Sequence, residues 1–180
     1  MPVNSVNADT SATDASHAWR DRWAGIQPWA STVARLVLGT VWIVAGASKA
    51  VDLDEAVRSV RAYRVLPEWA VPAVGAGLPF LEIALGALLI VGLGVRLSSV
   101  VSVALLTIFI AGIVSAGVRG LKIDCGCFGH GGDLAAGQNT AYTEEILRDI
   151  GLLILAAFLV WWPSGRFSVD RWINGEEDVR

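Results

Sequence analysis

Long apolar runs alternate with short charged segments along this chain. Crossing the hydrocarbon of a membrane takes roughly 20 mostly apolar residues at about 1.5 Å of helical rise each. Four segments approach this length: 29–49, 71–93, 97–118 and 143–162. The last gives the weakest signal, because its uninterrupted apolar run begins only at Ile150 and it reaches span length only by including Glu144, Glu145, Arg148 and Asp149. The pattern predicts an all-α integral membrane protein built as a four-helix bundle.

The connections between these segments differ in length and character. Only Gly94, Val95 and Arg96 separate the second segment from the third, so we expect these two helices to be antiparallel neighbours. Residues 51–70 separate the first segment from the second, and apolar side chains recur there among acidic and basic ones. This spacing predicts a short amphipathic helix on the surface, between the first two spans.

Three regions follow from this pattern. Residues 1–28 form a polar N-terminal tail, residues 29–163 the four-helix transmembrane domain, and residues 164–180 a polar C-terminal tail. We expect the first 18 residues to be disordered, because they contain too little apolar surface to offset the entropy of ordering. No apolar run near the start resembles a cleavable signal peptide, so the first helix is expected to remain as a signal anchor.

Composition supports the membrane interpretation. The chain is 54% hydrophobic and 17% charged, which leaves little polar sequence to cover a soluble core. A formal net charge of −3 with mixed signs provides no basic patch, so nucleic-acid binding is set aside. Positive charges are balanced between the two ends of the predicted bundle and do not decide its orientation.

Both cysteines of the chain lie in one glycine-rich loop after the third apolar segment. Cys125 and Cys127 flank Gly126 within the sequence Asp-Cys-Gly-Cys-Phe-Gly-His. Extended residues two apart place their Cα atoms about 6.6–7.2 Å from each other, whereas a disulfide needs roughly 4.4–6.8 Å. A bridge therefore requires the chain to bend at the glycine, and closure in so small a ring favours a strained, easily exchanged disulfide.

Neighbouring side chains leave several interpretations of this motif open. Lys122 and His130 would favour the reactive thiolate, whereas Asp124 would oppose it. Thiol redox chemistry is the favoured interpretation. A metal site could instead use Cys125, Cys127 and His130, with Asp124 or Asp133 as a fourth ligand, although zinc sites prefer wider cysteine spacing. The cysteines could also be incidental apolar residues.

Charged residues within or beside the apolar segments form the second group of candidates. Glu82 lies near the middle of the second segment, where an unpaired carboxylate would cost several kcal/mol. Arg35 in the first segment is expected to reach it from an antiparallel neighbour, and Arg148 approaches from the opposite side. Lys49 lies near an interface and can extend its ammonium group toward water. These residues either fix helix packing as buried ion pairs or form a functional polar site.

Taken together, these residues resemble the MauE branch of the DoxX-like membrane proteins, over about residues 30–162. The resemblance rests on Arg35, the Ala-Gly-Ala-Ser-Lys run ending at Lys49, residues 63–67, residues 79–82, the Cys-Gly-Cys-Phe-Gly run, and Arg148 with Asp149. It implies a four-helix membrane bundle linked to disulfide formation or isomerisation in exported proteins. The N-terminal tail lies outside the resemblance.

The resemblance also implies roles for the candidate residues. Cys125 and Cys127 would be catalytic, with Lys49, Arg35, Glu82, Asp124, His130 and Arg148 in support. A thioredoxin-like exported protein would exchange disulfides with the pair, and the electrons would leave through the bundle. A membrane quinone as their acceptor is a separate hypothesis, based on where electrons can go in a membrane, and no motif in the chain supports it. The cysteine loop would then face the exoplasm of the cell membrane, where disulfides persist, and the termini the cytoplasm. A metal-delivery module and a non-catalytic scaffold or small transporter remain as alternatives.

Overall fold

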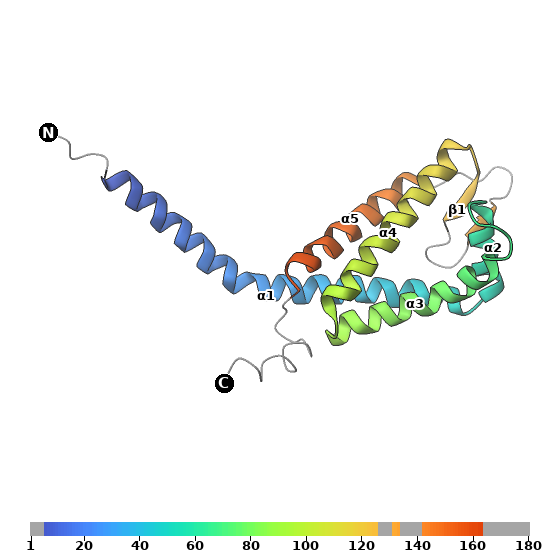
Figure 1. Ribbon diagram of the computed structural model, residues 1–180, viewed down its shortest axis with the longest axis horizontal. Helices are drawn as coiled ribbons and strands as arrows, with labels where there is room; N and C mark the ends of the chain where they lie inside the picture. Colours follow the sequence, from blue (N-terminus) through green and yellow to red (C-terminus); the bar gives the residue numbers. More distant parts are fainter. Residues whose placement is uncertain (1–5, 126–130, 134–141, 164–180) are drawn as a thin grey trace.

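Four long helices, one short helix and a small β-hairpin make up the described part of the protein. The computed structural model describes the backbone of residues 6–125, 131–133 and 142–163, and the side chains of residues 25–124 and 142–163. The elements are α1 (Val6–Ala50), α2 (Leu53–Ala62), α3 (Val71–Val91), α4 (Val95–Val118), β1 (Ile123–Cys125), β2 (Gly131–Asp133) and α5 (Tyr142–Trp161). As Figure 1 shows, α1 lies along α3 and α4 lies along α5, while α2 and the hairpin lie together at one end.

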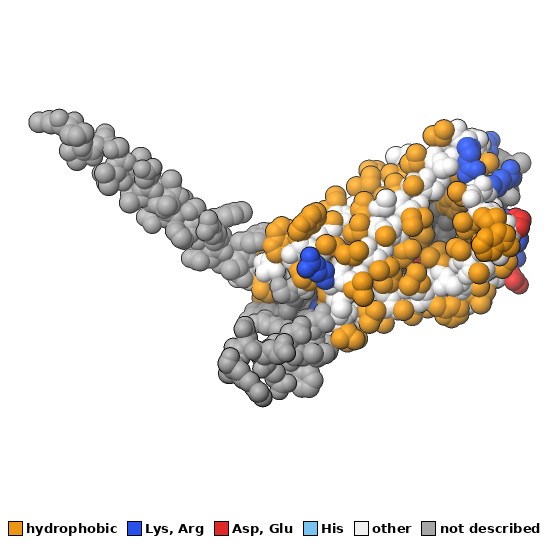
Figure 2. Space-filling model, viewed as in Figure 1, with side chains coloured by type: hydrophobic (Ala, Val, Ile, Leu, Met, Phe, Trp, Pro, Cys, Tyr) orange, Lys and Arg blue, Asp and Glu red, His pale blue; other side chains and the backbone are white. Residues whose placement is uncertain are grey.

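Within the described part of the chain, three helices are long and apolar enough to cross a membrane: Gly25–Ala50 within α1, together with α3 and α4. Large apolar side chains of these helices reach the outer surface, since Leu97 and Ile108 are 70% and 63% exposed, whereas the polar side chains of Ser99 and Glu82 are fully buried. Figure 2 shows this hydrophobic surface along the helices, with most of the charged side chains visible in this view at the end formed by α2 and one basic group at the opposite end. Apolar side chains outside and polar ones inside are the arrangement expected of a protein embedded in lipid.

The N-terminal region differs from the sequence-based expectation. Residues 1–28 were predicted as a polar tail, but α1 already begins at Val6 and continues through Pro28. A helix satisfies its backbone hydrogen bonds internally, so it does not need an apolar face to form, and alanine recurs in this segment. Composition alone therefore placed the start of the first helix too late.

Glycines allow α1 and α3 to pack at very short range. A methyl group built on Gly46 would lie 2.6 Å from the carbonyl oxygen of Pro79, and one on Gly86 would lie 2.6 Å from that of Gly39. Only residues without a side chain fit at such an approach, which is a common device between membrane helices. The contacts run antiparallel and set the level at which each residue of α1 meets α3.

A tight glycine turn joins α3 to α4, as the short connection predicted. Gly92 ends α3 with φ +78° and Gly94 precedes α4 with φ +58°, both in the left-handed region that side chains disfavour. Next to this turn all four long helices meet in one apolar core, which includes Leu38, Trp42, Leu89, Val95, Leu106 and Leu159. Away from the turn, α3 and α4 diverge (Figure 1).

The predicted amphipathic helix is present as α2. Asp52 caps its N-terminus by accepting a hydrogen bond of 2.8 Å from the backbone N–H of Glu55. Ala56, Ser59 and Ala62 are buried on one face. This face packs on α3, so α2 covers the end of the bundle at which α3 begins and α4 ends.

The tight contact between α1 and α3 can be tested at Gly86. We expect Gly86→Ala to lower the free energy of unfolding by about 1–3 kcal/mol, because the added methyl group collides with the backbone of α1. The matched control is Gly77→Ala on the same helix, where an added methyl group meets nothing within 4 Å. Thermal unfolding in detergent, followed by circular dichroism, measures both variants, and equal midpoints would contradict the packing described.

Candidate functional site

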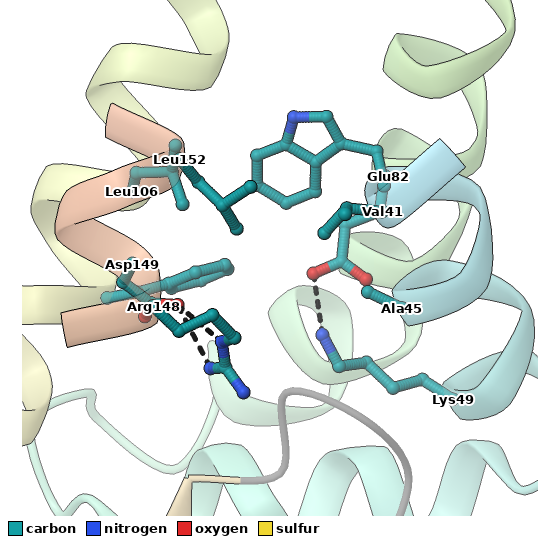
Figure 3. Close-up of a pocket in the computed structure, with 10 residues that line it drawn as sticks. Val41, Ala45, Lys49, Glu82, Leu106, Arg148, Asp149 and Leu152 are labelled. Carbon is teal, nitrogen blue, oxygen red and sulfur yellow. Dashed lines mark hydrogen bonds and ion pairs between the residues drawn. The ribbon is translucent and has the colours of Figure 1, made fainter. Parts of the chain in front are cut away.

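Four charged side chains gather around one small internal cavity near the hairpin end. Lys49 comes from the last turn of α1, Glu82 from α3, and Arg148 with Asp149 from α5. They line a space of about 20 Å³, roughly the room of one water molecule. Figure 3 shows the four groups facing this space, with apolar walls that include Leu106 and Leu152. The cavity lies between the two helix pairs, α1 with α3 and α4 with α5.

Lys49 and Glu82 form a buried ion pair. The ammonium Nζ of Lys49 donates to Oε1 of Glu82 at 2.6 Å, and the two side chains are only 8% and 0% exposed. Such a pair cannot rely on water for solvation, so each charge depends on the other. The ammonium also lies 5.7 Å from the ring centroid of Phe109 on α4, which gives it a favourable contact with the aromatic face.

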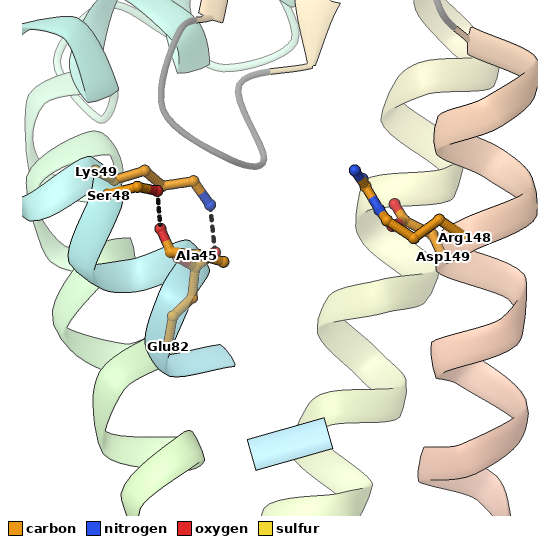
Figure 4. A network of polar contacts seen from close by, with 6 residues as sticks. All are labelled: Ala45, Ser48, Lys49, Glu82, Arg148 and Asp149. Carbon is orange, nitrogen blue, oxygen red and sulfur yellow. Dashed lines mark hydrogen bonds and ion pairs between the residues drawn. The ribbon is translucent and has the colours of Figure 1, made fainter. Parts of the chain in front are cut away.

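Arg148 and Asp149 form a second pair on the opposite wall. Nε and Nη2 of Arg148 lie 3.0 Å and 2.9 Å from Oδ1 of Asp149. Asp149 is buried, whereas the Arg148 side chain is one-third exposed. Figure 4 shows the two ion pairs on helices that face each other across the gap. Asp149 was not among the residues predicted to form a site, although a carboxylate beside an arginine at the start of an apolar helix indicates such a pair.

In each ion pair, one of the two carboxylate oxygens contacts the cation and the other does not. Among the residues that the structure describes, Oε2 of Glu82 and Oδ2 of Asp149 are buried and accept no hydrogen bond. A buried acceptor without a donor costs free energy, so both oxygens are suited to a small polar guest such as water or to a proton. The four charges sum to zero, which makes the site polar without a net charge.

The structure corrects the expected partner of Glu82. Arg35 was predicted to reach this carboxylate, but Lys49 does so instead. Arg35 precedes Lys49 by about 21 Å along α1, at the level of the turn between α3 and α4. There it is 1% exposed, one turn beyond Ser31, whose hydroxyl donates to the carbonyl oxygen of Trp162. Arg35 is therefore a buried charge of the opposite end and no part of this site.

The cysteine motif belongs to the hairpin formed by β1 and β2. The two strands are antiparallel, with Cys125 opposite Gly131 and Asp124 opposite Gly132. Asp124 is half-buried. The side chain of Cys125 and all of Cys127 and His130 lie outside the described residues. Among the side chains described, no three His, Cys, Asp or Glu residues form a metal-binding group, and the metal alternative depends on the residues beyond them.

Three side chains connect the base of the hairpin with the neighbouring helices. The hydroxyl of Tyr142, in the first turn of α5, donates to the carbonyl oxygen of Leu121 at 2.6 Å and accepts from the N–H of Ile123 at 3.2 Å. The buried side chain of Ile123 packs with Ala62 of α2 and Ala116 of α4. Arg119, just after α4, donates to the carbonyl oxygens of Tyr63 and Arg64. The hairpin, α2, α4 and α5 are thus tied together.

Comparison with known proteins adds a family likeness. The family model described as methylamine utilisation protein MauE matches residues 27–162. The methylamine utilization protein MauE of Paracoccus denitrificans is 36% identical over 107 residues, which cover 59% of this chain and 58% of that protein. The matched part thus spans less than two thirds of the relative. No solved structure matches this chain.

Because Lys49 and Glu82 form a buried ion pair, we expect substitution of one residue to destabilise the protein more than substitution of both. Glu82→Gln removes one charge and leaves the Lys49 ammonium buried without its counter-ion, so we expect a loss of about 3–5 kcal/mol in the free energy of unfolding. The double variant Lys49→Met/Glu82→Met removes both charges, and we expect it to recover most of that loss. Detergent unfolding of both variants beside the wild type measures the difference. A double variant that is at least as destabilised as Glu82→Gln would show that the two groups do not act as a pair.

Proposed function

Because this chain belongs to the MauE family, we propose that it is a membrane thiol–disulfide exchange protein that supports disulfide formation or isomerisation in exported proteins. Cys125 and Cys127 carry the chemistry in this proposal. The name of its Paracoccus relative associates that protein with methylamine utilization, and we propose that this chain also takes part in methylamine utilization. Its substrate is proposed only as a class, an exported thioredoxin-like protein with a cysteine pair.

The proposed arrangement has four membrane spans. α5 has 20 residues and lies along α4, but Glu144, Glu145, Arg148 and Asp149 shorten its apolar run. The neutral pairing of Arg148 with Asp149 lowers the cost of placing this first part of the helix in the membrane. Trp161 and Trp162 at the other end of α5 suit an interface. With an even number of spans, the start of the first span and the end of the last lie on one side of the membrane, and the hairpin lies on the other.

The register of the hairpin is the observation that supports the redox role most directly. Cys125 stands opposite Gly131, so the five-residue connection that contains Cys127 begins and ends at adjacent backbone positions. Covalent geometry keeps the two cysteines within about 7 Å at their Cα atoms, and Gly126 allows the bend that a bridge needs. The hydrogen bond from Ile123 to Tyr142 anchors β1, which ends at Cys125, to the first turn of α5.

The proposed reaction is a two-electron exchange. A thiolate of the partner attacks the disulfide between Cys125 and Cys127, and one of these sulfurs leaves as a thiolate that takes up a proton. The partner's second thiol then attacks the mixed disulfide. The partner ends as a disulfide and this chain as a dithiol. The hairpin end would face the exoplasm of the cell membrane, where disulfides persist.

Mass-tag alkylation tests the redox role and the orientation together. In intact cells we expect the wild type to take up no maleimide tag before reduction and two tags after it, because the cysteines form a bridge. A membrane-impermeant maleimide should label the reduced pair as completely as a permeant one. Each single variant, Cys125→Ser or Cys127→Ser, should take up one tag without reductant.

The matched control is Cys125→Ser/Cys127→Ser, which has no cysteine and should take up no tag under any condition. Two tags on the wild type without reductant would contradict the bridge. Labelling by the permeant reagent alone would contradict the exoplasmic hairpin. Protection of reduced cysteines by added zinc, lost in His130→Ala, would instead support the metal-binding alternative.

A further inference from the structure

A large apolar cavity lies beneath α2, where α3 and α4 diverge. Its volume is about 510 Å³, within the range typical of sites for small organic ligands. Val74 and Leu78 of α3 line one side, Leu105, Phe109 and Gly112 of α4 the other, and Tyr63 closes the end beside α2.

Access to the cavity is from the membrane. Val74 and Ile108 line it and are 40% and 63% exposed, and they belong to two helices apolar enough to span the membrane. Their exposed faces therefore meet hydrocarbon. A molecule that enters between them must be dissolved in the lipid, and its apolar part can lie along the apolar walls.

Lys49 supplies a charged group to the wall of the apolar cavity, where this cavity adjoins the small cavity. It lines both this cavity and the small cavity with four charges, as does Phe109. The other polar side chains on the wall are Ser59, Tyr63 and Ser115, and the hydroxyl of Ser59 donates to its own helix. An ammonium group carries three N–H donors, and the hydrogen bond to Glu82 uses one of them. Lys49 thus has donors to offer to a ligand.

Charge favours a neutral ligand over an anionic one. Glu82 already neutralises Lys49, and Asp149 neutralises Arg148, so a phosphate or carboxylate headgroup would add an unbalanced negative charge beside two carboxylates. A carbonyl oxygen accepts a hydrogen bond from the ammonium without adding charge. The ring of Phe109, 5.7 Å from Nζ, offers a flat apolar surface beside that donor.

We propose that this cavity binds a membrane quinone, with a ring carbonyl accepting from Lys49 beside Phe109 and the isoprenoid tail passing between α3 and α4 into the lipid. The neutral ring, its carbonyl acceptors and its apolar tail match the three features of the cavity. The hairpin is near, because Ile123 of β1 shares an apolar cluster with Tyr63 of the cavity wall.

The role of the quinone rests on the proposed function. The dithiol of Cys125 and Cys127 would give two electrons and two protons to the quinone, which becomes a quinol, while the sulfurs join as a disulfide. Atoms and electrons balance without a further reactant. The quinone would restore the oxidised pair after each exchange with the exported partner.

Binding can be tested with decylubiquinone and the purified full chain in lipid nanodiscs, with quenching of tryptophan fluorescence as the readout and a photoreactive azido-quinone to map the site. We expect saturable quenching and cross-links to cavity residues of α3 and α4. Gly112→Leu should weaken binding at least tenfold, because the new side chain enters the cavity beside Tyr63. Gly77→Leu, where added atoms meet open space, should bind within twofold of the wild type.

A second variant tests the headgroup contact independently of cavity filling. Lys49→Met/Glu82→Met leaves no buried charge unpaired but removes the donor, and we expect at least a tenfold loss of affinity. Equal affinity of both variants and the wild type, or cross-links outside the cavity, would overturn the proposal. So would displacement of the bound probe by oleate or by phosphatidylglycerol, which would identify a lipid site instead.

The outcome separates this site from the thiol chemistry. Cys125→Ser/Cys127→Ser should bind decylubiquinone as the wild type does, because the residues described on the cavity wall come from α1 to α4 and from the connection after α2. Quinone binding by a wild-type protein whose dithiol cannot reduce the quinone would leave the site standing and remove the redox role. Disulfide exchange by a protein that binds no quinone would do the reverse.

Discussion

Charge neutralisation away from water is the constraint on which the rest of this structure depends. An ammonium and a carboxylate within an apolar bundle persist only as a close pair, and Lys49 with Glu82 satisfies this at 2.6 Å. The pair fixes the last turn of α1 against α3, and close glycine contacts continue the same antiparallel register along both helices. Arg148 and Asp149 neutralise each other in the same way within α5. The two helix pairs therefore face each other through neutral but polar surfaces.

Much of the fold could be predicted from the sequence, because long apolar runs and helical periodicity identify helices whether or not they cross a membrane. The positions of α3, α4 and α5, the amphipathic α2 and the antiparallel turn at Gly92 and Gly94 all follow from local patterns. The start of α1 could not be predicted, since a polar segment rich in alanine is compatible with either a helix or a coil.

The site was less predictable, because ion pairing between helices depends on their register. The sequence placed Glu82 in one span and Arg35 in the neighbouring span, but it could not show whether the two residues lie at the same depth in the membrane. That depth is set by backbone approach at Gly39, Gly46 and Gly86, which brings Lys49 to Glu82 and leaves Arg35 at the opposite end. Asp149 joins the site through the packing of α5, which no local pattern specifies. The cysteine side chains lie outside the described part of the chain, so their role stays a prediction.

The glycine turn between α3 and α4 has a geometric consequence for the whole bundle. It holds these helices together at one end only, and α4 is about 36 Å long. A rotation of about 5° around this turn would move the far end of α4 by about 3 Å, whereas the core beside the turn would hardly change. Arg119 and Tyr142 tie that far end to the connection after α2 and to the segment that leads into β1. A change in the separation of α3 and α4 at that end would therefore also move β1, which carries Cys125.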